Sequence, residues 1–408
     1  MARGSRYAEL FQANPPFRFF WLSTLAGETG YAVYSITVVW LAIAISGQVA
    51  IAGIVLGIEY LVYALSFLVG PFVDRSRNLA RLLQFGFPLQ MLVAFAIGVL
   101  LILGWLTVPI LLVLVVGLSI LWNFTYVAQN SLLPRIVRED DLFRANGLVG
   151  AAGGVTQVAG FAAGGALLVL LGPAGGAFLY AGLNGAAGLL ALPLSVPQLR
   201  ARVTSVLEDF RAGWQRMFSP EGRPVLHLSV FSLAQAFFTT APALIVAWLA
   251  HSVFAHPAEA YSILFTAFAI GGVFGGLLVG SANPRRGILT WLSAATVMEG
   301  ALIATAVLVA PDLIGSAVVW LVVGVIDVIF FTICIAYLQA TTPGGMFGRV
   351  MTNFYLFRGS SRAVGAVVLG FLAGALLPVD LGYLIAFGWM MIGVLGQLAL
   401  PGLRRLAF

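Results

Sequence analysis

The sequence contains no lysine, so all 21 of its basic residues are arginine. Charge of either sign is scarce: 9% of the 408 residues are charged, whereas an average soluble domain has about 25%. Hydrophobic residues make up 61% of the chain, and the mean hydropathy is +1.03. These values exclude a soluble globular enzyme, a nucleic-acid-binding protein and a disordered scaffold, and they indicate an integral membrane protein.

Motifs for covalent or metal chemistry are also missing. The single cysteine, Cys334, excludes an intramolecular disulfide and a cysteine-based metal site. The sequence has no phosphate-binding loop, no metal-ligand spacing and no nucleophile arrangement, so we expect no enzyme activity, no cofactor and no metal.

Long apolar runs are what the sequence does contain. A helix needs about 20 apolar residues to cross the hydrocarbon core of a membrane, and the 47 glycines suit membrane helices that pack closely through small residues. The runs predict an all-α integral membrane fold with twelve spans. The predicted spans are 17–46, 50–73, 80–104, 107–133, 145–171, 175–196, 224–252, 258–281, 287–310, 313–340, 349–377 and 380–402.

Arginine is distributed unequally between the two sides of the predicted membrane. Arginines are frequent near both termini and in every second connection, including the longest polar segment at 197–223. The alternate connections contain none; they lie near 47–49, 105–107, 172–175, 253–257, 311–312 and 378–380. Because arginine-rich loops stay in the cytoplasm, we expect both termini to be cytoplasmic.

The segment 197–223 divides the chain into two halves. Apolar residues recur at helical spacing from Val203 to Phe218, which predicts an amphipathic helix on the cytoplasmic membrane surface. The ends of the fourth and tenth spans, QNSLLPRIV and QATTPGGMFGRV, both place glutamine, proline and arginine in that order. We therefore expect a six-helix bundle over 1–196, a linker over 197–223 and a second bundle over 224–408.

Short motifs stand at the cytoplasmic ends of the predicted spans. Gly70-Pro71-Phe72-Val73-Asp74-Arg75-Ser76-Arg77 follows the second span, Leu133-Pro134-Arg135-Ile136-Val137 ends the fourth, and Gly348-Arg349-Val350 begins the eleventh. In these motifs the chain resembles the major facilitator superfamily, and in particular its bacterial branch of macrolide-efflux and enterobactin-exporter-like proteins. In the fifth span Gly147, Gly160, Gly164 and Gly165 resemble the glycine pattern of the family's antiporters, although Thr156 and Phe161 replace its glycine and proline.

The resemblance implies a central cavity lined by spans 1, 4, 7 and 10 that opens alternately to each side of the membrane. It implies that Asp74 accepts hydrogen bonds at the start of the eleventh span, where a carboxylate is favoured by the helix dipole. With Gly70, Arg75 and Arg349, this aspartate would hold the cytoplasmic gate closed. The glycines of the fifth span would serve helix packing.

Ionisable side chains inside the predicted spans are the first candidates for function. An unpaired charge deep in the membrane costs about 2.5–3.5 kcal/mol even on a lenient scale, so these groups must face a wet cavity, pair with each other or be neutral. They are Glu28, Glu59, Glu299, Asp327, Arg358 and Arg362.

Glu28 lies about 16 Å into the first span, at about 1.5 Å per residue, and is either a proton-coupling or substrate-binding group or a structural hydrogen-bond partner. Asp327 has possible partners in Arg358 and Arg362, which share one face of the eleventh span. That contact is either a structural ion pair or a pair that breaks on protonation. Glu59 is open between a hydrogen bond and a cavity role, and we expect Glu299 to be structural.

Uncharged polar side chains on the cavity spans suit a bulky amphipathic ligand, although each of them is equally suited to ordinary helix packing. They are Tyr34, Asn123, Tyr126, Gln129 and Gln235. The sequence thus predicts a monomeric, proton-coupled exporter of a drug-like or siderophore-like compound, with no nucleic-acid partner. The alternatives are an importer or facilitator of a lipid-like or nutrient substrate, and a membrane receptor that does not transport.

Overall fold

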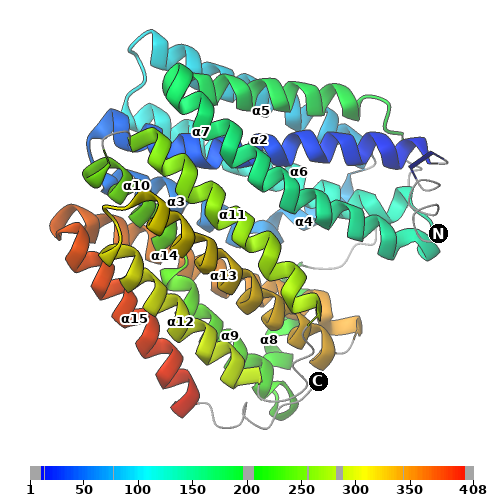
Figure 1. The fold of residues 1–408 in the computed structure, drawn as a ribbon. Helices are drawn as coiled ribbons and strands as arrows, with labels where there is room; N and C mark the ends of the chain where they lie inside the picture. Colours follow the sequence, from blue (N-terminus) through cyan, green and yellow to red (C-terminus); the bar gives the residue numbers. More distant parts are fainter. Residues whose placement is uncertain are drawn as a thin grey trace, which may run out of the picture. The chain divides into compact units, whose positions relative to one another are not determined.

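The computed structural model describes residues 11–12, 14–76, 78–195, 206–254, 257–281, 288–342 and 344–399. Within these ranges the chain forms helices and no strand (Figure 1). The helices are α2 (Pro15–Ser46), α3 (Val49–Ala64), α4 (Ser66–Arg75), α5 (Leu79–Ile102), α6 (Val108–Ile136), α7 (Glu139–Ala191), α8 (Val206–Phe218), the short 3-10 helix η1 (Pro220–Gly222), α9 (Arg223–Phe238), α10 (Ala241–Val253), α11 (Pro257–Ser281), α12 (Ile288–Leu308), α13 (Leu313–Thr341), α14 (Gly344–Ala375) and α15 (Pro378–Ala399).

Ten helical segments in the described part of the chain are long and apolar enough to cross a membrane. Two shorter apolar helices, Val49–Ala64 and Leu148–Ala162, lie where the second and fifth spans are predicted. The all-helical membrane architecture expected from the sequence is therefore confirmed, with ten full-length candidate spans.

Two predicted spans are interrupted. The second breaks at Leu65, between α3 and α4. The seventh breaks at Thr239 and Thr240, between α9 and α10. Pro242 stands in the first turn of α10, where a proline is tolerated because the first amide groups of a helix have no partner within the helix. An apolar run conceals such a break, because hydropathy is continuous across it.

Helix α7 contains a sharp turn at Gly172, whose φ is 66° and ψ is −171°. A left-handed φ favours glycine because a Cβ atom would collide with the following carbonyl group. Pro173 follows directly and begins the next helical segment with a fixed φ. This turn lies where the sequence separates the fifth predicted span from the sixth.

The chain forms two compact units. The first comprises Met1–Leu41 and Leu65–Val203, and within it α5 packs against α6 and α7. Its core contains Phe17, Leu83 and Leu132, all buried.

The second unit comprises Ala42–Ala64 and Thr204–Phe408. Its closest helix pairs are α11 with α13, α12 with α15, and α3 with α14. Its core contains Leu292, Phe330 and Phe354. Helix α3 therefore packs in this unit, against a helix that follows it by some three hundred residues of chain.

Small residues let α3 and α14 approach closely. A Cβ atom built on Gly53 would lie 2.5 Å from the carbonyl oxygen of Ala366, and one on Gly370 would lie 2.8 Å from the Cα atom of Gly53. We call this contact the α3/α14 seam. Larger side chains at either glycine would force the two backbones apart.

The linker forms the helix α8 over Val206–Phe218, while Val203 and its neighbours lie outside the described residues. The rings of Phe210, Trp214 and Phe218 follow one another along α8, and Trp214 also contacts Phe357 of α14, at 5.3 Å between ring centroids. Trp214 thus packs α8 on α14, whereas Phe218 at the end of α8 is 53% exposed.

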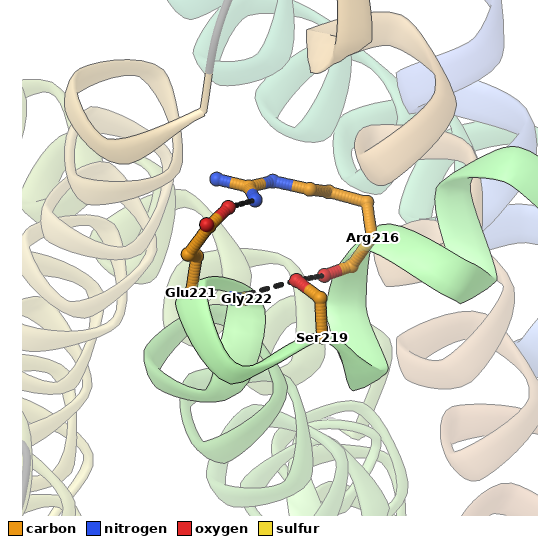
Figure 2. A network of polar contacts seen from close by, with 4 residues as sticks. All are labelled: Arg216, Ser219, Glu221 and Gly222. Atoms are coloured by element: carbon orange, nitrogen blue, oxygen red, sulfur yellow. Dashed lines mark hydrogen bonds and ion pairs between the residues drawn. The ribbon is translucent and has the colours of Figure 1, made fainter.

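The turn from α8 to α9 is held by polar contacts (Figure 2). Arg216 forms an ion pair with Glu221. The hydroxyl of Ser219 donates to the carbonyl of Arg216 over 2.8 Å and accepts from the amide of Gly222 over 3.1 Å. These contacts fix the direction in which α9 leaves the linker.

Candidate functional site

A buried polar network lies within the second unit and is centred on Arg358 of α14. This arginine is 7% exposed. Its Nη1 atom donates to the hydroxyl of Ser232 over 2.6 Å and to Oε1 of Gln235 over 3.0 Å, and both partners lie on α9. The guanidinium also lies 5.7 Å and 5.3 Å from the ring centroids of Phe330 and Phe331 on α13, within reach of cation–π attraction.

The network continues from Gln235 to a carboxylate. The amide Nε2 of Gln235 donates to Oε2 of Glu299 on α12 over 3.2 Å. Glu299 is 1% exposed, and its other oxygen, Oε1, has no hydrogen-bond partner among the described residues. Gln235 thus links a buried cation to a buried carboxyl group through the two ends of one amide.

Asp327 of α13 is half-buried and adds a second acidic group. It interacts through its charge with Arg358 and Arg362, but no direct ion pair joins it to either arginine within the described part of the chain. The sequence places these three residues in one region, as the structure does. It misses that Glu299, through Gln235, is the carboxyl group linked to Arg358 by hydrogen bonds.

Arg362 lies one helical turn beyond Arg358 and has different surroundings. Its guanidinium carbon is 4.0 Å from the ring centroid of Tyr60 on α3. Its Nε atom is buried and makes no hydrogen bond to any described residue. Glu59, adjacent to Tyr60 on α3, is 8% exposed.

In the first unit, Glu28 lies half-buried on α2. No hydrogen bond or ion pair of its carboxylate is found among the residues that the structure describes. One turn away, Thr24 accepts a hydrogen bond from Nε2 of Gln129 over 3.3 Å. One turn after Glu28 on the same helix, the ring of Tyr31 stacks on Trp122 of α6, with 4.5 Å between ring centroids.

Aromatic side chains continue from this point along the first unit. Trp122 stacks on Tyr126 at 5.0 Å, and Tyr34 stacks on Tyr180 of α7 at 4.9 Å. Asn123, also predicted as a cavity residue, is 1% exposed. The predicted polar residues of this unit therefore stand beside a set of stacked rings from α2, α6 and α7.

The first unit also contains a buried series of hydrogen bonds that the sequence analysis did not predict. The hydroxyl of Tyr180 donates to Oε1 of Gln90 over 3.0 Å, and Nε2 of Gln90 donates to the hydroxyl of Thr125 over 3.1 Å. The available signal was Gln90, one of the two glutamines in the apolar run of α5. A single amide in such a run gives no indication of its partners.

The structure describes the side-chain positions of only some of the predicted gating and packing residues. Gly70, Asp74 and Arg75 lie in α4, and Gly147 and Gly165 lie in α7, but the structure does not describe their side-chain positions. Arg349 lies near the start of α14 and is half-buried, and its Nη1 atom donates to Sδ of Met346 over 3.5 Å.

Gly160 and Gly164 pack against α2. A Cβ atom on Gly160 would lie 2.5 Å from Cβ of Ala32, and one on Gly164 would lie 3.2 Å from Cα of Val33. These two glycines thus allow α7 and α2 to approach.

Comparison with known proteins identifies the relatives of this chain. A family model described as transmembrane secretion effector matches residues 5–403. An enterobactin exporter EntS from Escherichia coli O1:K1 is 28% identical over 264 residues, which cover 64% of this chain and 57% of the relative. Its counterpart from Shigella flexneri is 28% identical over 260 residues, covering 64% and 56%. The aligned region thus spans less than two thirds of the length of these relatives.

Solved structures show the same fold. A POT family transporter in complex with 5-aminolevulinic acid matches with a TM-score of 0.78 at 9% identity, covering 96% of this chain and 97% of the other. The nucleoside transporter NupG matches with a TM-score of 0.75 at 13% identity, covering 94% and 98%. At these identities the likeness concerns the fold alone.

Proposed function

Because the chain belongs to the transmembrane secretion effector family of major facilitator transporters, we propose that it is a proton-coupled exporter of an amphipathic organic compound. The transporter class follows from the family. The direction of transport, the exchange for protons and the alternating-access cycle belong to the proposal, as do twelve spans, two cytoplasmic termini and a place in the inner membrane.

The environment of Glu28 carries the proposal. A buried carboxylate with a structural role is held by hydrogen bonds or an ion pair, and the described residues provide none for Glu28. A carboxyl group at this depth that lacks a fixed partner can take up a proton at moderate cost, since its neutral form is the cheaper one in an apolar environment. This is the property that a proton carrier requires.

The stacked rings beside Glu28 indicate the kind of substrate. Tyr31 lies one helical turn from Glu28 and stacks on Trp122, which in turn stacks on Tyr126, and the ring systems of a ligand stack on such aromatic side chains. The relatives named as enterobactin exporters support a siderophore-like compound. In the proposed cycle Glu28 takes a proton from outside and releases it inside as the substrate loads.

One proton per cycle provides enough energy for useful export. A charge that crosses 100 mV gains about 2.3 kcal/mol, which corresponds to a concentration ratio of about fifty. Export driven by the proton gradient therefore needs no nucleotide hydrolysis.

Proton flux in proteoliposomes tests the proposal. Purified protein is reconstituted with an internal pH-sensitive dye, and a panel of siderophores, drugs and lysolipids is added to the wild type and to Glu28→Gln. We expect substrate-dependent proton movement in the wild type and its loss in the variant. Glu259→Gln, the same change at an exposed position in the first turn of α11, should behave as the wild type.

Other outcomes select the alternatives. Substrate movement without proton flux, unchanged in Glu28→Gln, would contradict antiport and favour a facilitator. Movement of no compound in the panel would favour a receptor that does not transport.

A further inference from the structure

Arg362 differs from Arg358 in how its charge is satisfied. Arg358 donates two hydrogen bonds and is linked through Gln235 to a carboxyl group. Arg362 is only half-buried, has its guanidinium carbon over the ring of Tyr60, and has a buried Nε that makes no hydrogen bond within the described residues. One arginine is thus held inside a closed network, and its neighbour one turn away is not.

The ring of Tyr60 cannot satisfy this cation alone. A guanidinium has five N–H donors in a planar fork, and the face of one aromatic ring attracts the cation but accepts few of these hydrogen bonds. This attraction is weaker than the cost of placing a charge in a membrane-spanning helix. The fork matches a carboxylate or phosphate in size and geometry, and an anion that arrives from outside the protein would supply the missing acceptors.

The side chains around Arg362 favour an aromatic anion. Tyr60 and Tyr63 lie one turn apart on α3, and Tyr355 and Arg362 lie two turns apart on α14, so each pair shares a helix face. Tyr63 and Tyr355 meet edge to face, with 6.2 Å between ring centroids. All four side chains are half-buried, so this face of the α3 and α14 pair is aromatic, cationic and partly open.

The charged groups nearby define what an anion must compete with. Arg358 on the same helix interacts with Arg362 through its like charge, and Asp327 on α13 interacts with both arginines. Glu59 precedes Tyr60 on α3, and Glu299 on α12 is linked to Arg358 rather than to Arg362. Asp327 is the acidic group with a charge interaction with Arg362 in the described part of the chain, so an anion must compete with it.

We propose that Arg362, stacked on Tyr60, binds the acidic group of the transported compound, and that this compound is an aromatic carboxylate or phenolate. The inference rests on the proposed transport function and narrows its substrate class to anions. It assigns recognition of the acidic group to the second unit, separately from the proton-binding role proposed for Glu28 in the first unit.

Three ligands that share the naphthalene ring system and carry a negative, a zero or a positive charge test the proposal by binding alone. We would measure 1-naphthoate, neutral 1-naphthamide and cationic 1-naphthylmethylammonium by equilibrium dialysis against the full-length protein in detergent. We expect 1-naphthoate to bind the wild type at least tenfold more tightly than 1-naphthamide. Arg362→Gln should weaken 1-naphthoate about tenfold or more, as expected for a hydrogen bond to a charged group, and leave 1-naphthamide unchanged.

Two further variants provide control measurements. Arg362→Lys keeps the charge and should retain part of the preference for the anion. Asp327→Asn removes the internal competitor and should tighten 1-naphthoate binding, a gain that a misfolded protein cannot show. This variant keeps the test decisive if Arg362→Gln does not fold.

Three results would overturn the anion site: equal binding of all three ligands, preference for the cation, or anion binding that neither Arg362→Gln nor Asp327→Asn alters. These results would leave the transport proposal intact, because that proposal is judged by substrate-dependent flux. Conversely, an anion preference that depends on Arg362, without any flux, would support the binding site and contradict the transporter mechanism.

Discussion

Arg358 shows how a guanidinium is accommodated inside an apolar helical unit. Its donors meet a hydroxyl and an amide oxygen of α9, and two phenylalanine rings of α13 lie beside it. Removing one member of a buried charged network leaves the others unsatisfied, and this costs more than the interaction itself contributes.

We expect Arg358→Met to lower the free energy of unfolding by about 3–5 kcal/mol, the range for breaking a buried charged pair on one side. The measurement is denaturant unfolding in mixed micelles. Adding Glu299→Gln should restore part of the loss, because it removes the carboxyl group that Arg358 balances. An Arg358→Met variant as stable as the wild type would show that the network carries no net stability.

The sequence reveals such residues singly but not their pairing. A charged or amide side chain in an apolar run is visible in the sequence. Arg358 and Gln235 were predicted as functional candidates, Glu299 was expected to be structural, and Ser232 was not singled out. Arg358 and Gln235, however, are 123 positions apart. Their contact depends on which faces of α9 and α14 meet, and hydropathy does not determine those faces because both helices are apolar on most sides.

At the scale of helices, the sequence predicts positions well and interruptions poorly. Helices α12 and α13 follow the predicted spans 287–310 and 313–340 closely. The breaks at Leu65 and at Thr239–Thr240 were missed because local backbone geometry, rather than hydrophobicity, distinguishes them from a continuous helix. The turn at Gly172 was found because a left-handed residue there requires glycine and proline follows it.

The α3/α14 seam gives a matched pair of glycine variants one turn apart on α14. A Cβ atom at position 370 would meet the backbone of Gly53, whereas one at Gly374 meets no atom within 4 Å. We expect Gly370→Ala to destabilise the protein by about 1–3 kcal/mol, as overpacking does. Gly374→Ala should be neutral or stabilise it by up to about 1 kcal/mol. Thermal unfolding in detergent compares the two, and equal effects would show that the seam tolerates separation.

For the molecule as a whole, the sequence yields the membrane class and the family, and it predicts two halves joined by a polar segment. It does not reveal that α3 packs in the second unit. Sequence order places α3 in the first half, and only the match of its small residues with those of α14 shows where it packs.

The orientation predicted from the arginines can be tested by cysteine labelling. Cys334 is buried, so we expect a maleimide that does not cross membranes to leave the wild type unmodified. Gln48→Cys, in an exposed connection, should react from outside intact cells. Glu208→Cys on α8 should react only in inverted vesicles. The reverse pattern would show that the termini lie outside.

The position of α3 also has a consequence for how the protein is made. Its partner surface on α14 is translated about 300 residues later, which takes roughly 15–60 s at about 5–20 residues per second. For that interval the small-residue face of α3, with Glu59 and Tyr60, is in the membrane without its final neighbour. Ribosome-bound chains that stop before α14 should therefore be the most vulnerable intermediates of biogenesis, and the most dependent on insertion factors or lipid to cover this helix.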